Sequence, residues 1–312
     1  MKSVNPDNFS RILTAYNSNA DSQSISFMPS LYIIEPTNYC NLSCPICPNS
    51  KYLNSEKGFM NIDLYKRIIH QISEYADLIQ LFWVGEPLLN NDLAQMISIA
   101  KANTSAKISI STNGILISSE SIQRLIDAGL DEIIVSMDAA SSNEVYNSVR
   151  KNGDLITLNN NVKGIIDYSE KISIILKFII TNTNRIELDE FIEKWKPYNV
   201  SVKINCLYTW ANQMPELRSY SDYLSPVENI SRVPCSDLWY KIPIHWNGDV
   251  SLCCFDWSFN HCVGNIASQS VFDIWNSAKM VEIRKAHKMH DFISLCKNCD
   301  AWATPSEYEE LL

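Results

Sequence analysis

The sequence predicts an α/β fold in which six parallel strands, each followed by a helix, form a partial (βα)6 barrel. A smaller unit with a β-hairpin and a helix is expected to follow. Short apolar runs alternate with helix-like segments from Leu31 to Leu207, and the connections are short, which predicts the barrel. Cysteines return without this alternation after Pro226, which predicts the smaller unit. We therefore expect a lead-in over 1–30, a core over 31–225 and a C-terminal unit over 226–312.

The predicted elements follow from local signals. Asn61 is expected to cap the first long helix, and Gly129 and Pro197 are expected to end two later ones. The expected strands are 31–36, 78–83, 107–111, 132–137, 173–180 and 200–207, and the expected helices are 62–72, 91–102, 118–128, 142–149, 155–168 and 186–196. In barrels of parallel strands, reactive groups sit in the loops at the C-terminal ends of the strands.

Composition narrows the class of protein. The 312 residues include no long apolar run at the N-terminus, so neither a signal peptide nor a membrane span is expected. That favours the cytoplasm, where ten cysteines are better explained by metal binding or catalysis than by disulfides. The net charge is −9 and there is no basic stripe, so nucleic acid is a poor candidate partner.

Three cysteines follow the first predicted strand in a C-x3-C-x2-C spacing. Cys40, Cys44 and Cys47 can hold a [4Fe–4S] cube by three of its irons and leave the fourth iron open to a small molecule. A zinc site is the alternative, but zinc needs a fourth ligand at close range. No Cys or His follows Cys47 until His70, so the spacing favours the iron–sulfur cluster.

This motif, just after a first strand, resembles that of the radical SAM superfamily. The resemblance implies a partial barrel of the radical SAM type, in which the open iron binds the amino and carboxyl groups of S-adenosyl-L-methionine. It also implies an electron donor such as flavodoxin or ferredoxin. Ile46 stands where the family usually has an aromatic residue, which keeps an apolar contact and loses the ring.

The resemblance extends to polar residues after the next strands. Gly85-Glu86-Pro87 is similar to the family's GGEP motif, with Val84 in place of the first glycine. Relatives use polar groups at strand ends to hold the ribose and the methionyl carboxylate, and an arginine to meet that carboxylate. Ordinary turn and cap chemistry is the alternative for each residue. The cofactor-binding residues implied in this way are Gly85, Glu86, Ser111, Asn113, Ser136, Asp138 and Arg150.

Residues on or after the last two barrel strands are candidates for the substrate side. They are Lys177, Asn182, Asn205, Tyr208, Trp210 and Asn212, and nothing in the sequence assigns them a specific role. Cys206, on the sixth predicted strand, is expected to be an inert core thiol.

The C-terminal cysteines resemble the SPASM/twitch extension of radical SAM enzymes. Cys235 is followed by twelve residues, Gly248, four residues and Cys253, with a hairpin expected at Asn247-Gly248. The resemblance implies one auxiliary [4Fe–4S] cluster on Cys235, Cys253, Cys296 and Cys299, without an open iron and acting as an electron relay or a structural plug. A four-cysteine zinc site remains the alternative.

Two cysteines are left over. Cys254 lies beside a proposed ligand, where it is either a hydrogen-atom donor, as in some radical SAM epimerases, or a small buried residue. Cys262 has no assigned role.

The resemblance implies an enzyme that cleaves S-adenosyl-L-methionine reductively and removes a hydrogen atom from its substrate. The favoured outcome is oxidation of a sugar, an aminocyclitol or a peptide-like natural product, with the electron passed to the auxiliary cluster. Epimerisation through Cys254 is the second hypothesis. Peptide cross-linking is less favoured because no leader-recognition domain is expected in this sequence, and a non-catalytic zinc or iron–sulfur protein is the hypothesis from another class.

Overall fold

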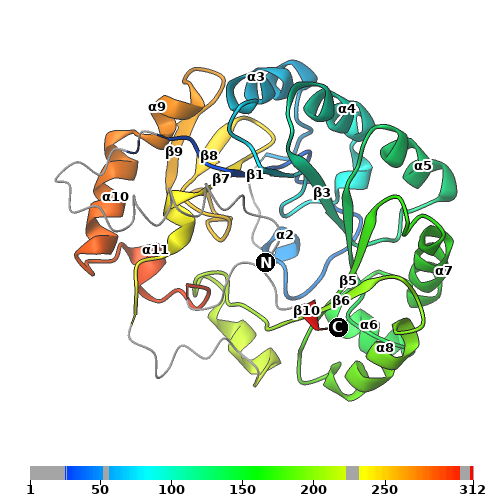
Figure 1. The fold of residues 1–312 in the computed structure, drawn as a ribbon. Helices are drawn as coiled ribbons and strands as arrows, with labels where there is room; N and C mark the ends of the chain where they lie inside the picture. Colours follow the sequence, from blue (N-terminus) through cyan, green and yellow to red (C-terminus); the bar gives the residue numbers. More distant parts are fainter. Residues whose placement is uncertain (1–24, 26, 52–55, 223–231, 303–309, 312) are drawn as a thin grey trace.

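A computed structural model describes residues 25, 27–51, 56–222, 232–302 and 310–311. Its strands form one sheet in the order β10-β6-β5-β4-β3-β2-β1-β7-β8-β9. β1 to β6 run parallel and are neighbours in sequence order, as the alternation predicts. The helices form an arc around the outside of this curved sheet (Figure 1). The α/β class and the parallel arrangement are therefore confirmed.

The barrel elements lie close to their predicted positions. The strands are β1 (Leu31–Ile34), β2 (Leu78–Gln80), β3 (Lys107–Thr112), β4 (Glu132–Ser136), β5 (Ser173–Ile179) and β6 (Ser201–Asn205). The helices are α2 (Pro48–Lys51), α3 (Ile62–Ile72), α4 (Leu93–Asn103), α5 (Ser119–Asp127), α6 (Asn143–Val149), α7 (Leu155–Ile166) and α8 (Leu188–Trp195). Short 3-10 turns lie at Pro87–Leu89, Arg185–Glu187, Pro215–Tyr220 and Ser236–Trp239.

Local chemistry explains why these helices begin and end where they do. Asn61 accepts hydrogen bonds from the first backbone N–H groups of α3, which satisfies donors that have no partner within the helix. Gly129 follows α5 with a φ of +99°, a conformation that disfavours residues with a side chain. The apolar face of α3 packs onto the sheet through Tyr65, Ile68 and Ile72, all fully buried.

Two predicted elements differ from the structure. β2 ends at Gln80, three residues early, and Phe82 and Trp83 turn into the central cavity. The single helix expected at 186–196 is a 3-10 turn followed by α8. The break falls at Glu187. Its carboxylate accepts hydrogen bonds from the backbone N–H groups of residues 140, 141 and 142.

The C-terminal unit continues the barrel sheet. β7 (Lys241–Ile244) pairs in parallel with β1, and β8 (Asp249–Ser251) and β9 (Cys262–Asn265) follow antiparallel. The hairpin turn lies at Gly248, as predicted. α9 (Val271–Trp275), α10 (Ala278–Lys288) and α11 (Ser294–Lys297) flank these strands (Figure 1), and β10 (Glu310–Leu311) pairs antiparallel with β6 at the opposite edge.

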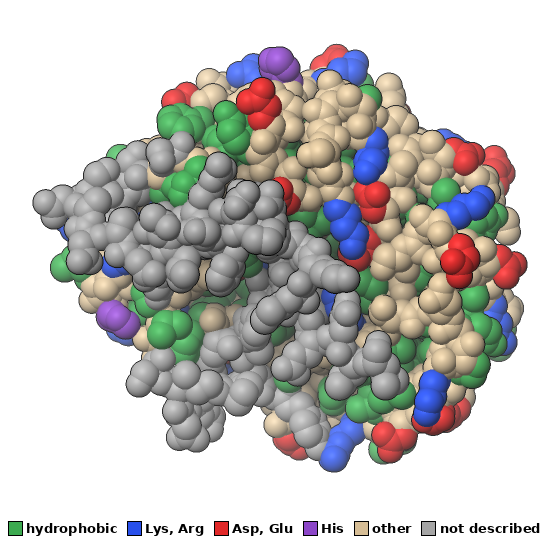
Figure 2. Space-filling view, in the orientation of Figure 1, with side chains coloured by type: hydrophobic (Ala, Val, Ile, Leu, Met, Phe, Trp, Pro, Cys, Tyr) green, Lys and Arg blue, Asp and Glu red, His purple; other side chains and the backbone are tan. Residues whose placement is uncertain are grey.

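The predicted domain boundaries stay predictions. Most of the 1–30 lead-in and the 225/226 boundary lie outside the described residues. No helix in the described part of the chain has the length and apolar character needed to cross a membrane. On the face drawn in Figure 2, acidic and basic side chains are interspersed over the barrel side.

Candidate active site

Both cysteine sets predicted from the sequence line one cavity. It has a volume of about 1060 Å³, at the upper end of the range of roughly 300–1,000 Å³ for ligand pockets. One set lies in the loop after β1, and the other lies in the C-terminal unit. The thiols on the cavity wall include Cys40, Cys44, Cys47, Cys235, Cys253, Cys296 and Cys299.

The first cysteine loop is held by hydrogen bonds that leave its thiols facing the cavity. The Cys47 N–H donates to the Cys44 carbonyl at 3.1 Å, and the Ser50 hydroxyl donates to the same carbonyl at 2.8 Å. Burial raises the pKa of all three thiols, that of Cys47 to about 12. Binding of iron would therefore have to displace their protons.

Gly85 and Glu86 join this loop to the end of β2. A Cβ atom at Gly85 would lie 2.0 Å from the Thr37 carbonyl oxygen, so the backbone approach there requires glycine. The Glu86 carboxylate accepts the Thr112 hydroxyl at 2.7 Å and the Asn113 N–H at 2.8 Å. Burial raises the pKa of Glu86 above its usual value. Gly85, Glu86 and Asn113 thus all line the cavity.

Arg150 and Asp138 form a buried pair beside the first cysteine loop. Arg150 Nε donates to Asp138 at 2.5 Å, and Arg150 Nη1 lies 4.0 Å from Cys44 Sγ. Burial opposes the charge of Arg150, but Asp138, Cys44 and Tyr146 together outweigh burial and raise the pKa of the guanidinium. Ser111, Ser136 and Arg150 line the cavity.

Asp138 is placed differently from the prediction of a direct cofactor contact. Its side chain is fully buried, and its second carboxylate oxygen accepts the Ile179 N–H at 2.5 Å. It does not line the cavity, and it has a φ of +56°. The carboxylate therefore holds Arg150 in place from behind the cavity wall.

The second cysteine set is drawn from three segments of the C-terminal unit. Cys235 precedes the 3-10 turn at Ser236–Trp239, Cys253 follows β8, and α11 carries Cys296, with Cys299 just after it. Burial raises the pKa of all four thiols, that of Cys296 to about 12. Their common exposure to the cavity brings together residues up to 64 positions apart in sequence, from 235 to 299.

Each of the two cysteine sets offers only thiols as ligands. Among the described residues, no three His, Cys, Asp or Glu side chains gather closely enough to hold one metal ion. Zinc draws four ligands to about 2.3 Å from one centre, whereas the thiolates of a cube bind different irons. Thiolates are the ligands that iron–sulfur clusters take, so the residues present fit such a cluster.

Cys254 also faces the cavity. Trp83 Nε1 donates to the Cys254 carbonyl at 2.8 Å, which fixes the loop, and burial raises the pKa of this thiol to about 11. Cys206 lines the cavity as well, contrary to the expectation of a core thiol. The Cys262 thiol instead donates to the Gly264 carbonyl at 3.3 Å and does not line the cavity.

Four of the substrate-side candidates line the cavity, namely Lys177, Asn205, Tyr208 and Trp210. Asn182 and Asn212 do not, and each accepts a hydrogen bond from a neighbouring loop residue. Burial and then the charge of Arg150 lower the pKa of Lys177 to about 8. With this pKa, roughly one lysine in ten is a neutral amine at pH 7, and about half are neutral at pH 8.

Trp210 was expected only as a substrate-side residue, but it also ties the two cysteine regions together. Its indole N–H donates to the Ile46 carbonyl at 3.0 Å, and its ring meets Phe255 edge-on at 5.8 Å. Residues 210–212 are three successive non-glycine residues with φ between 54° and 62°. Such strained runs persist only where the surroundings fix them and are enriched at functional sites. No glycine or asparagine-glycine signal in the sequence marks this turn.

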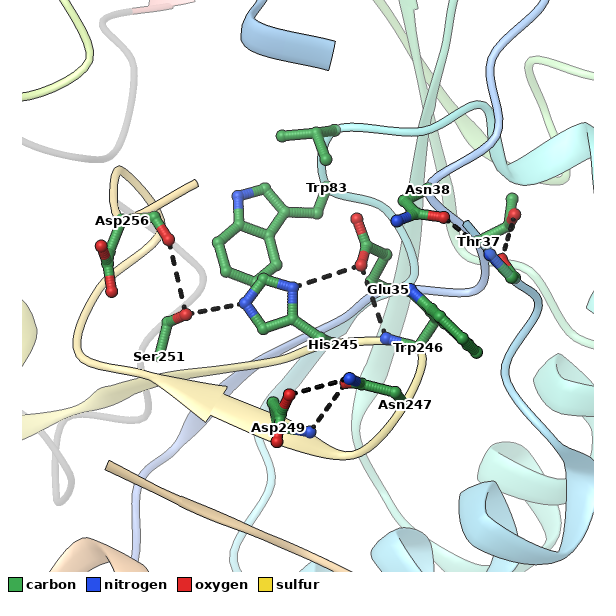
Figure 3. Close-up of polar contacts among 12 residues, drawn as sticks. Glu35, Thr37, Asn38, Trp83, His245, Trp246, Asn247, Asp249, Ser251 and Asp256 are labelled. Atoms are coloured by element: carbon green, nitrogen blue, oxygen red, sulfur yellow. Dashed lines mark hydrogen bonds and ion pairs between the residues drawn. The ribbon is translucent and has the colours of Figure 1, made fainter. Parts of the chain in front are cut away.

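A buried polar network braces the cavity wall behind Trp83 (Figure 3). His245 contacts Glu35 at 3.3 Å and Ser251 at 2.7 Å, and its ring stacks between Trp83 and Phe259 with both centroids 3.8 Å away. The three side chains have the order of a hydrolase triad. Ser251 is 1% exposed and does not line the cavity, so it is a structural link between β1 and β8 and not a nucleophile.

A family model for the radical SAM superfamily matches residues 34–193, which are 160 of the 312 residues. The chain belongs to the radical SAM superfamily. A second model, for the SPASM iron–sulfur cluster-binding domain, matches residues 235–300 of this radical SAM protein. Membership implies that the protein binds a [4Fe–4S] cluster and S-adenosyl-L-methionine. The SPASM match implies that it also binds auxiliary iron–sulfur clusters.

Individual relatives are distant. This radical SAM enzyme is 25% identical to the S-adenosyl-L-methionine-dependent 2-deoxy-scyllo-inosamine dehydrogenase of Niallia circulans, over 91% of this chain and 98% of that protein. It is 28% identical to a "Probable GTP 3′,8-cyclase" of Methanocaldococcus jannaschii over 63% of this chain, and it spans only 64% of that protein. The crystal structure of BtrN in complex with AdoMet and 2-DOIA matches with a TM-score of 0.61 and 22% identity, over 91% and 99% of the two chains. The structural match supports the fold.

Proposed function

We propose that this radical SAM enzyme is an oxidoreductase that oxidises a hydroxyl-bearing carbon of a sugar, an aminocyclitol or a related natural product. The observation that carries the proposal is the single cavity lined by both cysteine sets and by Lys177. The similarity to a protein named as an inosamine dehydrogenase, along nearly its whole length, supports the same class of substrate.

The two cysteine sets would hold two different groups. Cys40, Cys44 and Cys47 would hold the cluster that binds the cofactor, and the later four cysteines would hold the auxiliary cluster. When bound, these groups supply hydrogen-atom abstraction and a one-electron acceptor, which is chemistry that the side chains lack. The protein supplies position and exclusion of water. Arg150, held by Asp138, is placed to bind the carboxylate of the cofactor by two parallel hydrogen bonds.

The Glu86 carboxylate is placed to accept the cofactor's amino group. Its hydrogen bonds to Thr112 and Asn113 fix its direction and leave the side chain on the cavity wall. Ser111 and Ser136, at the ends of β3 and β4, offer hydroxyl groups to the ribose. Ile46 is buried on the same wall, and it has the apolar surface that an adenine ring would contact.

Lys177 is the residue best placed to take the hydroxyl proton of the substrate. Oxidation of a carbinol to a ketone removes a hydrogen atom from carbon, a proton from oxygen and one further electron. A base with a pKa near the working pH transfers protons efficiently, and the Lys177 pKa of about 8 meets that condition. Its side-chain nitrogen makes no hydrogen bond to the described residues, so in its neutral form the amine is available to the substrate.

The test uses 2-deoxy-scyllo-inosamine and a panel of sugars and aminocyclitols as probes. Anaerobically reconstituted enzyme, cofactor and reductant are incubated with each compound, and products are followed by mass spectrometry. We expect a product two mass units lighter and one 5′-deoxyadenosine for each product formed. A substrate deuterated at the reacting carbon should transfer that deuterium to 5′-deoxyadenosine. A product that keeps the substrate's mass in ordinary water, and carries a solvent deuteron at carbon in deuterated water, would overturn the proposal.

Epimerisation is the second candidate, because the Cys254 thiol also lies on the cavity wall. A thiol there is placed to return a hydrogen atom to a substrate radical. The Cys254→Ala variant distinguishes the two in deuterated water. A dehydrogenase keeps making its ketone without this thiol, whereas an epimerase loses its product.

A further inference from the structure

A buried imidazole lies beside the second cysteine set. His287, on α10, is fully buried and lines the same cavity as Cys235, Cys253, Cys296 and Cys299. Its Nδ1 accepts the backbone N–H of Cys235 at 3.3 Å. Phe292 packs against the ring edge-on, with centroids 4.9 Å apart. The orientation of the imidazole is thus fixed from two sides.

The hydrogen bond to Nδ1 determines where the imidazole carries its proton. A nitrogen that accepts an N–H has a lone pair, so a neutral ring carries its proton on Nε2. Nε2 is buried and has no hydrogen-bond partner among the described residues. Leaving a buried donor unpaired is costly, so this N–H is expected to have an acceptor when the protein is loaded. The thiols of the auxiliary set are among the groups that line the same cavity.

Arg232 offers a second donor at the same place. Its guanidinium lies 4.1 Å from the ring centroid of Phe292, and its Nη1 donates to the Lys297 carbonyl at 2.9 Å. Its Nε is buried, has no hydrogen-bond partner within the described part of the chain, and belongs to a side chain that lines the cavity. Two side chains, each with a buried N–H that has no acceptor among the described residues, therefore line the cavity with the four thiols, and the charge of Arg232 acts on Cys296 and Cys299.

We propose that His287 donates its Nε2–H to a sulfur atom of the auxiliary cluster, and that His287 and Arg232 together raise the reduction potential of that cluster. A reduced cluster carries one more negative charge than the oxidised cluster, and hydrogen bonds to its sulfur atoms stabilise that charge. The use of this potential to receive the substrate's electron rests on the proposed dehydrogenase function. The hydrogen bond itself does not, because it needs no substrate.

The experiment isolates the auxiliary cluster by replacing Cys40, Cys44 and Cys47 with alanine. In this background the midpoint potential is measured by redox titration monitored by electron paramagnetic resonance. The His287→Phe variant should reduce with an equilibrium constant about tenfold smaller, which is about 59 mV for one electron. His287→Gln keeps one acceptor and one donor and should stay close to the parent. His70→Phe, an exposed histidine on α3, is the matched control and should change nothing.

A second measurement needs no substitution at His287. It therefore tests the proposal even if the His287→Phe variant fails to bind its cluster. Protein labelled with ¹⁵N-histidine should show hyperfine coupling between the reduced auxiliary cluster and an imidazole nitrogen. Its exchangeable proton should disappear from the spectrum in deuterated water. Absence of this coupling, or an unchanged potential in a fully loaded His287→Phe variant, would overturn the proposal. Both readouts are independent of turnover. A negative result therefore rejects the hydrogen bond without rejecting the dehydrogenase proposal, and the reverse also holds.

Discussion

Replacing Asp138 with asparagine should destabilise the protein through Arg150. The pair is buried, with side-chain exposures of 13% for Arg150 and 0% for Asp138. Removal of one partner of such a pair leaves an uncompensated charge, at a cost of about 3–5 kcal/mol. Asparagine retains the acceptor for the Ile179 N–H and tolerates the φ of +56°, so the substitution isolates the charge. Because Arg150 borders the cavity, we expect the lower value, about 3 kcal/mol.

The assay is thermal unfolding of the anaerobically reconstituted protein. A loss of about 3 kcal/mol corresponds to a fall of roughly 5–10 °C in melting temperature. Glu193→Gln is the control, because Glu193 and Lys196 are 69% and 58% exposed and their pair should contribute no more than about 0.5 kcal/mol. Asp138→Asn should also bind S-adenosyl-L-methionine more weakly, since Arg150 is no longer held. If both variants melt alike and bind the cofactor alike, the role given to Asp138 is wrong.

Three further predictions concern single side chains. Gly85→Ala should lose iron from the first cluster and should lose cofactor binding, because the added Cβ would lie 2.0 Å from a backbone oxygen. Gly164→Ala in α7 is the control. Its Cβ meets nothing within 4 Å, and the substitution should stabilise the protein by about 0.5–1 kcal/mol. Lys177→Met should abolish product formation in an enzyme whose activity rises with pH through about 8. The same variant should melt at a higher temperature than the parent at pH 7. This advantage should shrink between about pH 8 and 10.5, because only the unfolded lysine stays protonated there. Cys254→Ala should retain the oxidised product in deuterated water, without deuterium at the reacting carbon, and loss of that product would favour epimerisation.

Features set by neighbouring residues could be predicted from the sequence. The Asn61 cap, the Gly129 helix end and the hairpin turn at Gly248 each depend on a few adjacent positions, and all three are present. The prediction of a cluster site at Cys40, Cys44 and Cys47 likewise depended only on their spacing within one loop. The parallel direction of β1 to β6 followed from the strand-then-helix alternation with short connections.

Features set by distant pairs could not be predicted in this way. β7 pairs with β1 across some two hundred residues, and His245 meets Glu35 across 210 positions. No local pattern distinguishes His287 from an ordinary helical histidine. Its buried position beside Cys235, which makes it a candidate hydrogen-bond donor to the auxiliary cluster, is seen only in the structure. For Asp138, the sequence predicted its position at the end of β4. It could not predict the pairing with Arg150, which keeps the carboxylate off the cavity wall.

Iron content and cofactor cleavage, measured on the same preparations, test the central claim most directly. Two four-iron clusters predict about eight irons in each chain, and the variant with alanine at Cys40, Cys44 and Cys47 should retain about four. The parent should release 5′-deoxyadenosine under reducing conditions, and the variant should release none. Stoichiometric zinc in place of iron, with no cofactor cleavage by the parent, would contradict the account.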